Sequence, residues 1–477
     1  MARDVPSPRH SLPRRRRASQ PGPSAGDARA LAWEILQAVE AGAYADALLG
    51  HRLTRSGLAP RDQALVTRLV YGTLAWQSYL DHIIAAFSRR PPQALDAPVR
   101  VLLRMALFQT CLLTRVPDFA AVNTAVQLAK RFRGGAAAGL VNAVLRRATS
   151  EWPQVQLPAA ADDPAGHLAL RLSHPRWLVE RWLARYGFAD TEALLRADNE
   201  PAPTVLRVNR CKIERAQLLA RLHDAGCAAE PTTYSPVGIR VEHAGPPEQI
   251  SGYADGLFSL QGEASQLVGF LVAPRPGDSV LDACAAPGGK ATHLAELMQD
   301  QGEIVALDPN AAGIRRVAHM GQRLGLSIVR TAVADALTWR PTADGFDRVL
   351  VDAPCSGLGT LRQHPEVRWR RTPEDITGLA TLQTQLLRHL ADCVRPGGTL
   401  VYATCTLSAE ENDDVLATFR RLQPAFCIDD PRPLLPEAAY ALIDADGVLR
   451  TFPHRHGLDG FFAARLKRRE TRGIVSA

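Results

Sequence analysis

Residues 279–290 read Ser-Val-Leu-Asp-Ala-Cys-Ala-Ala-Pro-Gly-Gly-Lys, and this stretch decides the fold of the C-terminal part of the chain. The apolar run Ser279–Cys284 predicts a buried strand, Ala285–Lys290 predicts a tight turn, and residues 291–298 predict a helix. The two glycines let the backbone of the turn approach a ligand, and the helix that follows points free N–H groups outward, which suits a carboxylate. The stretch therefore predicts a strand, a ligand-binding turn and a helix.

Further strands and helices alternate from about residue 256, which is typical of a parallel α/β sheet. Polar or reactive side chains end four successive strands: Asp308, Asp335, Asp352 with Cys355, and Cys405. Each has an ordinary structural explanation, because a strand-end aspartate commonly caps a helix and a buried cysteine usually packs as a small apolar residue. Ligands bind outside the carboxyl ends of strands in such sheets, so four ends in register predict one shared site.

The same turn limits the class of ligand. It is not Gly-x-Gly-x-x-Gly, which weakens the case for NAD, and it is not a Walker A loop, because Ala291 and not Ser or Thr follows Lys290. Asp308 lies 20 residues after Gly288, where an acidic residue that binds a ribose is expected. We therefore expect a nucleotide-type cofactor that is neither a dinucleotide nor a triphosphate.

The rest of the chain divides into segments of different character. Residues 1–26 carry six arginines and few large apolar side chains, which predicts a disordered basic arm. Residues 27–152 predict a compact helical bundle, with Asp27 as an N-cap and an apolar face that recurs at helical spacing. Residues 153–166 predict a linker, residues 167–255 a small α+β module with strands at 204–208 and 238–241, and residues 470–477 a tail.

The net charge of +7 over 477 residues is unevenly distributed. Residues 1–152 contain 21 basic and 10 acidic residues, a balance of +11, whereas residues 153–477 contain 35 and 39, a balance of −4. The asymmetry indicates an anionic partner such as nucleic acid, held mainly by the N-terminal third. Solvated surface charge without a partner explains the same numbers equally well.

Composition excludes several classes of protein. No apolar run approaches the ~18 residues that a membrane span needs, and no signal-peptide core follows the first basic cluster, so we expect a cytoplasmic protein. Eight cysteines without a Cys-x-x-Cys pair argue against a disulfide framework and against zinc. His364 has no partner in the sequence. We expect no metal, no membrane contact and a monomeric chain.

Two sets of motifs resemble known families. Residues 116–130 and 139–147 are similar to the NusB family of RNA-binding helical domains, although Thr124 stands where that family usually has an acidic residue. Cys284–Lys290, Asp352–Gly357 and Tyr402–Thr406 resemble the signature motifs of the S-adenosylmethionine-dependent RNA cytosine-5 methyltransferases. Residues 258–266 look like the lead-in helix of that catalytic domain, and residues 460–465 resemble its closing strand.

The resemblance implies a fold, a cofactor and a partner. The fold class is multidomain: an all-α NusB-like bundle, a small α+β RNA-binding module, and an α/β Rossmann-like class I methyltransferase domain over residues 256–469. The cofactor is S-adenosylmethionine and the partner is 16S ribosomal RNA, whose cytosine at position 967 is the target of the branch with a NusB-like domain. The implied cofactor-binding residues are Cys284, Ala285, Ala286, Pro287, Gly288, Gly289, Lys290, Asp308 (ribose), Asp335 (adenine amine) and Asp352.

The chemistry of cytosine C5 methylation explains why such an enzyme uses two cysteines. Cytosine C5 is a poor nucleophile, and addition of a thiolate to C6 converts the ring into an enamine that can attack a sulfonium methyl group. The resemblance implies that Cys405 attacks C6 and Cys355 assists removal of the C5 proton. Asp352 would bind the cytosine edge and, if protonated, supply a proton towards N3. In DNA cytosine-5 methyltransferases the cysteine of the Pro-Cys motif is itself the nucleophile, so Cys355 and Cys405 could exchange these roles.

Two further questions stay open in the sequence. Trp369, with Arg368, Arg370 and Arg371 beside it, could stack on a base or hold a phosphate, or it could be a core tryptophan within a solvated charge run. The function could also be methylation of transfer RNA, or RNA binding in an assembly or antitermination factor without catalysis. Retention of both cysteines and of the strand-end aspartates argues against a non-catalytic domain.

Overall fold

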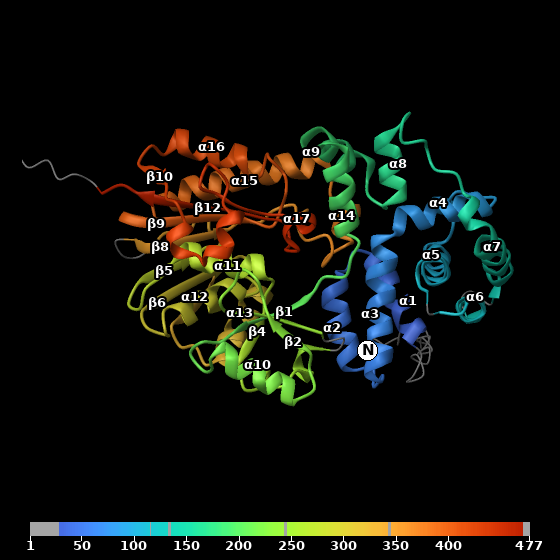
Figure 1. The fold of residues 1–477 in the computed structure, drawn as a ribbon, viewed down its shortest axis with the longest axis horizontal. Helices are drawn as coiled ribbons and strands as arrows, with labels where there is room; N and C mark the ends of the chain where they lie inside the picture. The colour runs from blue at the N-terminus through green and yellow to red at the C-terminus, as the bar shows by residue number, and fades with distance from the viewer. Residues whose placement is uncertain (1–27, 115, 132–134, 243–245, 342–344, 471–477) are drawn as a thin grey trace, which may run out of the picture.

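A computed structural model describes residues 28–114, 116–131, 135–242, 246–341 and 345–470 of the chain. The predicted basic arm, the Asp27 cap and nearly all of the C-terminal tail lie outside these ranges. A helical domain occupies one end of the molecule and a sheet domain the other, with a smaller sheet beneath the latter (Figure 1). No helix within the described ranges is both long and apolar enough to cross a membrane.

The N-terminal domain is a helical bundle around a single core. Helix α5 lies at its centre and is buried on all sides, as the nearly continuous apolar run from Val99 to Phe108 predicts. A Cβ on Gly72 of α3 would lie 1.9 Å from the ring of Phe108, so the two helices pack closely there. The helices are α1 (Ala28–Glu40), α2 (Ala45–Thr54), α3 (Pro60–Ala75), α4 (Gln77–Phe87), α5 (Ala97–Leu112), α6 (Asp118–Arg131) and α7 (Ala138–Glu151).

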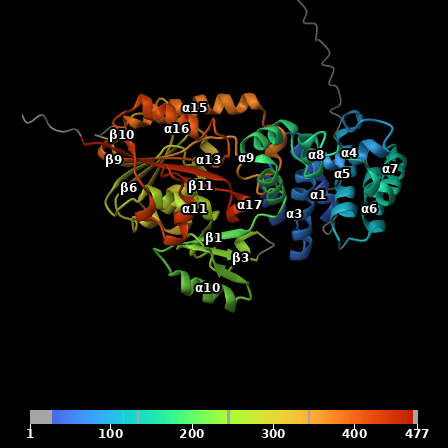
Figure 2. The same ribbon diagram turned by 45° about the horizontal axis from the view of Figure 1, so that its top comes forward.

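Two helices that the sequence placed in a linker and a middle module belong structurally elsewhere. Helix α8 (Pro164–Arg171) begins inside the predicted linker 153–166, where the side chain of Asp163 accepts a hydrogen bond from the Gly166 amide and caps it. Helices α8 and α9 (Arg176–Ala197) share a core with Leu358, Leu361, Ile376 and Leu407 of the large sheet domain. They therefore lie between the helical domain and the sheet domain (Figure 2).

The middle module is a four-stranded antiparallel sheet with one helix packed on it. Residues 258–260, which the sequence predicted as the start of a helix, form its fourth strand instead. Phe258 is fully buried in the core of this sheet, and residues 258–260 pair with residues 206–208. The strand order is β2-β3-β1-β4, and the elements are β1 (Thr204–Val208), β2 (Ala229–Pro231), β3 (Gly238–Val241), β4 (Phe258–Leu260) and α10 (Arg215–Asp224).

The C-terminal domain is a mixed sheet in the order β10-β12-β9-β8-β5-β6-β7, with β11 paired to β12. Strands β5 to β9 are parallel, whereas β12, the last strand in the chain, runs antiparallel to β9 and lies between β9 and β10. The strand order reverses between the neighbouring strands β5 and β8, and open α/β sheets bind ligands at such a switch point. The strands are β5 (Ser279–Asp282), β6 (Glu303–Asp308), β7 (Val329–Val333), β8 (Phe346–Asp352), β9 (Val394–Thr404), β10 (Phe426–Ile428), β11 (Leu449–Thr451) and β12 (Phe461–Arg468).

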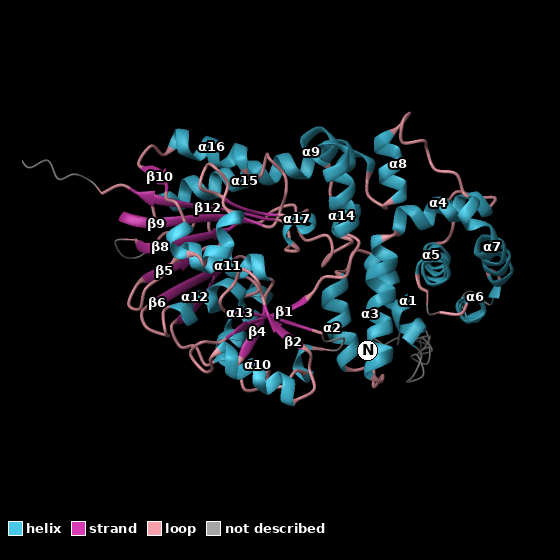
Figure 3. Ribbon diagram, in the orientation of Figure 1, coloured by secondary structure: helices cyan, strands magenta, loops and turns pink. Residues whose placement is uncertain are grey.

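Helices cover both faces of this sheet, and a core lies on each side (Figure 3). Helices α11, α12 and α13 pack on one face, and α15 and α16 pack on the other. The predicted multidomain fold class is thus confirmed. The bounds are α11 (Glu263–Val272), α12 (Gly289–Leu297), α13 (Ala311–Leu324), α14 (Val367–Arg370), α15 (Pro373–Ala391), α16 (Asp413–Leu422) and α17 (Pro453–His456).

The short helix α14 joins the helical domain to the loop that contains Cys355, and its contacts decide between the two interpretations left open for Trp369 and its arginines. Arg368 is 0 % exposed, and its guanidinium donates to Asn199 Oδ1 at 2.8 Å and to carbonyl oxygens beside α8 and α9. Trp369 Nε1 donates to Leu74 O at 2.6 Å, and Arg370 donates to the carbonyl oxygens of Val39 and Ala43. These side chains hold domains together and are not free to stack on a base or bind a phosphate.

Candidate active site

The side chains predicted at the strand ends all lie at the carboxyl edge of the parallel strands. Asp308 is the last residue of β6 and Asp352 the last of β8. Asp335 lies two residues after β7, and Cys405 directly follows β9. Because these strands are parallel neighbours, residues at their carboxyl ends meet at one edge of the sheet.

Cys355 and Cys405 meet at this edge, with their Sγ atoms 3.3 Å apart. The backbone explains the meeting: the Gly359 amide donates to Cys405 O at 2.9 Å, and the Gly460 amide donates to Gly359 O at 2.7 Å. A Cβ on Gly359 would lie 2.0 Å from the carbonyl oxygen of Gly460, so a larger residue would push the loops apart. The geometry allows one bound base to lie next to both sulfur atoms.

Lys290 and Asp352 form an ion pair beside the cysteines, with Nζ and Oδ2 2.5 Å apart. The ammonium group also lies 5.4 Å from the centre of the Phe461 ring. Burial opposes the charged ammonium, but Asp352 and, more weakly, Cys405 outweigh it and raise the pKa of Lys290. The sequence analysis assigned Lys290 to the cofactor turn alone, and the structure places it against the proposed cytosine-binding aspartate as well.

Glu411 is a site residue that the sequence analysis missed. Its side chain is 0 % exposed and lies between the two cysteine loops. One carboxylate oxygen accepts the Ser356 amide at 2.7 Å and Gln383 Nε2 at 3.0 Å, and the other accepts the Ser356 hydroxyl at 2.5 Å. In the sequence Glu411 stands within the acidic run Glu410–Asp414, which gives no sign that one member is buried.

Arg371, considered from the sequence as a possible phosphate contact, and Arg207, which was missed, each support the site from a different element. Arg371 Nε donates to Ser356 O at 3.0 Å, directly after the cysteine at 355. Arg207 lies in β1 of the small sheet, is fully buried, and pairs with Glu296 on α12 at 2.8 Å. It also donates to Gly289 O, so the small sheet holds the helix that begins at the predicted cofactor turn.

The two cysteines have different electrostatic surroundings. The pKa of Cys355 is raised well above its usual value, first by the hydrogen bond with Cys405, then by burial and by the charges of Cys405 and Glu411. Tyr402, whose own pKa is raised by burial and then by Cys355 and Glu411, lies on the same side. Cys405 is instead among the groups that face Lys290. Cys405 therefore interacts electrostatically with Lys290, which is itself paired with Asp352, and Cys355 interacts with Glu411.

The turn after β5 has the features of a cradle for a cofactor. Gly288 adopts φ +115°, and a Cβ there would lie 2.9 Å from the Cα of Val317, so a side chain is excluded. Both carboxylate oxygens of Asp282 are buried without a hydrogen-bond partner in the described part of the chain. Burial, and then the charge of Asp352, raise the pKa of Asp282 to about 7. Burial likewise raises the pKa of Cys284, with Asp282 adding to it.

Asp308 and Asp335, which the resemblance assigns to the ribose and the adenine amine, both lie at the carboxyl edge of the sheet. Asp308 accepts hydrogen bonds from the amides of Ala286, at 3.2 Å, and Asn310, at 2.8 Å. Asp335 accepts from the Leu337 amide at 2.9 Å. The close glycine turn, the unpartnered Asp282 oxygens and these acidic groups suit a ligand with an amino group, two hydroxyls and an aromatic amine, so S-adenosylmethionine fits the donor and acceptor set.

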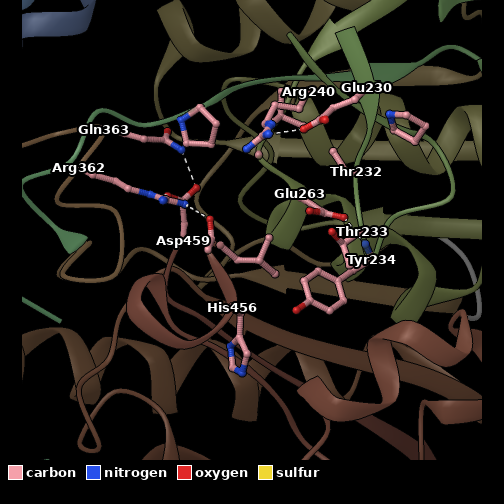
Figure 4. Close-up of a pocket in the computed structure, with 16 residues that line it drawn as sticks. Glu230, Thr232, Thr233, Tyr234, Arg240, Glu263, Arg362, Gln363, His456 and Asp459 are labelled. Carbon is pink, nitrogen blue, oxygen red and sulfur yellow. Dashed lines mark hydrogen bonds and ion pairs between the residues drawn. The ribbon is translucent and has the colours of Figure 1, made fainter. Parts of the chain in front are cut away.

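A separate cavity of about 210 Å³ lies between the small sheet, the start of α11 and the loops around residues 362 and 457 (Figure 4). Its lining includes Tyr234 and Arg240 but neither cysteine. Arg362 and Gln363 converge on the Asp459 carboxylate at 3.0 and 2.6 Å, as Figure 4 shows. This cavity borders the active-site loops, since Asp459 directly precedes Gly460, but it is not the cysteine site.

One group of side chains in the described residues could share a cation, and it lies away from the cysteines. Ligand atoms of Asp46, His364 and Glu366 lie within 4.8 Å of one another at the junction of α2 and the loop before α14. The sequence analysis dismissed His364 because it had no partner, and the tertiary structure supplies two. Glu366, 2 % exposed, already uses one oxygen to accept the Ala45 amide at the start of α2.

Comparison with protein families matches three segments of the chain. The family described as 16S rRNA methyltransferase RsmB/F matches residues 269–467. The NusB family matches residues 26–150, and the RsmF/B-like ferredoxin-like domain matches residues 174–248. The three matches follow one another in the order of the helical domain, the middle module and the large sheet.

Curated proteins and solved structures agree with these matches. The ribosomal RNA small subunit methyltransferase B of Pseudomonas putida is 39% identical over 368 residues, 76% of this chain and 82% of that protein. The protein of the same name from Vibrio cholerae is 32% identical over 88% of this chain and 94% of its own. The crystal structure of PH0851 aligns with a TM-score of 0.80 and 26% identity over 93% of this chain and 99% of its own. A methyltransferase homologue protein from Pyrococcus horikoshii aligns with a TM-score of 0.55 and 28% identity over 64% of this chain and 99% of its own.

Proposed function

Because the chain belongs to the RsmB/F family of 16S rRNA methyltransferases, we propose that it methylates C5 of one cytosine in 16S ribosomal RNA, with S-adenosylmethionine as the donor. We further propose the cytosine at position 967 as the target. The family assignment confirms the enzyme class predicted from the sequence. One observation supports the mechanism above all: the Sγ atoms of Cys355 and Cys405 lie 3.3 Å apart, beside the ion pair of Lys290 and Asp352.

The cofactor is held by the cradle at the carboxyl edge of β5 and β6. The turn Cys284–Lys290 receives its methionine end, Asp308 its ribose hydroxyls and Asp335 its adenine amine. S-adenosylmethionine, when bound, supplies an electrophilic methyl group on a sulfonium. The acidic groups around the turn favour that positive charge, since opposite charges attract strongly in a site with little water.

Cys405 is the nucleophile in this proposal, because the raised pKa of Cys355 leaves that sulfur protonated. A thiolate, not a thiol, attacks carbon. Lys290 faces Cys405, whereas the charged neighbour of Cys355 is the Glu411 carboxylate. The charge distribution therefore supports attack by Cys405 on C6 and leaves Cys355 as a thiol at that stage.

Asp352 and Lys290 act together on the base. Asp352 pairs with Lys290 at 2.5 Å, and in this proposal its carboxylate accepts a hydrogen bond from the cytosine amine. The proton that moves towards N3 during attack then comes from Lys290, and it returns to Lys290 when the C6–Sγ bond breaks. This assigns to the lysine the donor role that the sequence analysis considered for Asp352.

Cys355 acts after the methyl group has reached C5. Once Cys405 is bonded to C6 it carries no charge, so the largest influence that raises the pKa of Cys355 is removed. Cys355 can then lose its proton to solvent and accept the C5 proton, while the bond between C6 and Sγ of Cys405 breaks and Cys405 leaves as a thiolate. Two cysteines in contact thus perform opposite halves of one reaction.

The helical domain and the small sheet complete the enzyme by holding the RNA. We propose that the NusB-like domain, whose residues 27–152 contain 15 basic and 9 acidic residues, binds RNA phosphates. A monomer is sufficient, because one chain contains both cysteines and the cofactor cradle. Since its substrate is ribosomal RNA, we place the enzyme in the cytoplasm.

Bisulfite sequencing of 16S and transfer RNA, from cells with and without this protein, tests the proposal. We expect one 16S cytosine to lose its methyl mark without the protein, and the wild-type enzyme but not Cys405→Ala to restore it. Loss of a mark from transfer RNA alone would assign a different substrate. Full restoration by Cys405→Ala would overturn the proposed nucleophile.

A further inference from the structure

Glu411 connects the two cysteine loops more directly than any predicted site residue. The residue after Cys355 donates to it twice, through the Ser356 amide and the Ser356 hydroxyl. The residue after Cys405 reaches it as well, because the Thr406 hydroxyl lies 2.7 Å from Ser356 Oγ and 3.2 Å from Glu411 Oε2. Each cysteine therefore directly precedes a residue whose hydroxyl group forms a hydrogen bond with Glu411.

Hydrogen-bond donors surround the carboxylate of Glu411. Its carboxylate accepts from the Ser356 amide, the Ser356 hydroxyl and Gln383 Nε2, and the Thr406 hydroxyl is close enough to add a further bond. A protonated carboxyl would give up an acceptor position and would need an acceptor of its own. No ion pair of Glu411 with a basic side chain is present in the described part of the chain, so its charge is balanced by hydrogen bonds.

The charged and titratable groups around Cys355 come from several elements. Cys405 and Tyr402 come from β9 and its end, Glu411 from the loop before α16, and Arg371 from the residue after α14. The guanidinium of Arg371 binds the main-chain oxygens of Ser356 and Cys355. Within this group Glu411 provides the fixed negative charge, whereas Lys290 provides the positive charge near Cys405.

We propose that Glu411 is the positioning residue that assigns the two roles: its carboxylate holds both loops and keeps Cys355 a thiol, so that Cys405 alone attacks C6. This rests on the proposed function, and it adds the group that decides between two sulfur atoms in contact. It also explains why a carboxylate is buried here without a cation. Burial of a charge is costly, and a neutral amide would satisfy the same positions less well.

The test compares Glu411→Gln with the neighbouring control Glu410→Gln in the full-length chain. Glu410 is partly exposed and pairs with Arg181, away from the cysteines. Alkylation by iodoacetamide is followed for each cysteine by peptide mass spectrometry over a range of pH. In Glu411→Gln we expect the Cys355 profile to move to lower pH by about one unit, which makes its alkylation about tenfold faster at pH 7.5. Glu410→Gln should match the wild type.

Covalent trapping gives the second readout. With RNA that carries 5-azacytidine, the wild type should form adducts through Cys405 only, whereas Glu411→Gln should form some through Cys355. An unchanged Cys355 profile in a folded Glu411→Gln protein would overturn the role of Glu411, even if Cys405→Ala remains inactive. If Glu411→Gln fails to fold, the alkylation rates of the two cysteines are compared in the wild-type protein. Alkylation of Cys355 as fast as that of Cys405 would contradict the proposal. Activity of Cys405→Ala would instead contradict the proposed function.

Discussion

The indole Nε1 of Trp369 donates a hydrogen bond of 2.6 Å to the carbonyl oxygen of Leu74, at the end of α3. The next residue, Arg370, donates to Val39 O and Ala43 O and lies 4.9 Å from the ring of Tyr44. Two residues of α14 thus bind the ends of helices in the N-terminal domain. The following residue, Arg371, binds the main chain of the cysteine loop. The helical domain and the cysteine loop are therefore held by α14 and the residue that follows it.

Weakening this junction should loosen the helical domain without changing the catalytic groups. Trp369→Phe removes the hydrogen bond to Leu74 and keeps most of the ring, so we expect a loss of about 1 kcal/mol in the free energy of unfolding. Trp369→Ala also removes the packing and should cost about 3 kcal/mol. Urea unfolding and limited proteolysis between residues 152 and 164 measure the effect. Equal stability of wild type and Trp369→Ala would show that the junction does not contribute.

The two cysteine variants should fail at different steps. Cys405→Ala should form no adduct with 5-azacytidine RNA, because the attacking sulfur is absent. Cys355→Ala should accumulate an adduct even with unmodified RNA, because removal of the C5 proton is slowed. Denaturing gels with labelled RNA distinguish the outcomes. The reverse pattern would exchange the two roles.

Replacement of Lys290 should separate catalysis from cofactor binding. Lys290→Met removes the partner of Asp352 and the proposed proton donor, so we expect kcat to fall by about 10²-fold or more. Binding of S-adenosylmethionine should weaken by less than about tenfold, since the rest of the turn remains. Calorimetry and single-turnover kinetics measure the two quantities. A loss confined to cofactor affinity would show that Lys290 binds the cofactor and does not act as the proton donor.

Asp308 should matter for the cofactor and not for the RNA. Asp308→Ala removes the acceptor proposed for the ribose hydroxyls, and we expect the Kd for S-adenosylmethionine to rise by about tenfold or more. Glu303→Gln at the other end of β6, where the side chain makes an exposed pair with Arg330, is the matched control. Isothermal titration should detect no change for the control. Equal affinities in all three proteins would contradict the ribose role.

Asp282 should give the stability of the protein a specific pH dependence. Its pKa is raised to about 7 in the folded state by burial, against about 3.9 in an unfolded chain. Its protonated form favours folding, so this contribution is present below about pH 4 and is lost as the pH rises to 7. The difference in unfolding free energy between Asp282→Asn and wild type should therefore grow in favour of the variant, by up to about 4 kcal/mol. Urea titrations from pH 4 to 8 measure it, and a constant difference would contradict the shift.

Local patterns predicted much of the fold. The strand Thr204–Val208 and the helix Ala311–Leu324 have the predicted bounds, because each has a clear apolar periodicity and an evident end. The prediction of a single helix over residues 258–266 was wrong. Their first three residues form a strand because they pair with β1, a partner some 50 residues earlier in the chain that no local pattern reveals.

By itself the sequence determined most of the elements and the chemistry that each strand end offers, since spacing and side-chain type are local properties. Only the tertiary structure decided which of those groups face one another. Cys355 meets Cys405, Lys290 meets Asp352, and Glu411 lies between the cysteine loops, across separations of 50 and more residues. The tertiary structure also places Trp369 and its arginines at a domain junction, where their hydrogen-bond partners lie about 170 to 330 residues away in the sequence. Burial and long-range hydrogen bonds set the charge environment of each group, and these exist only once the chain has packed.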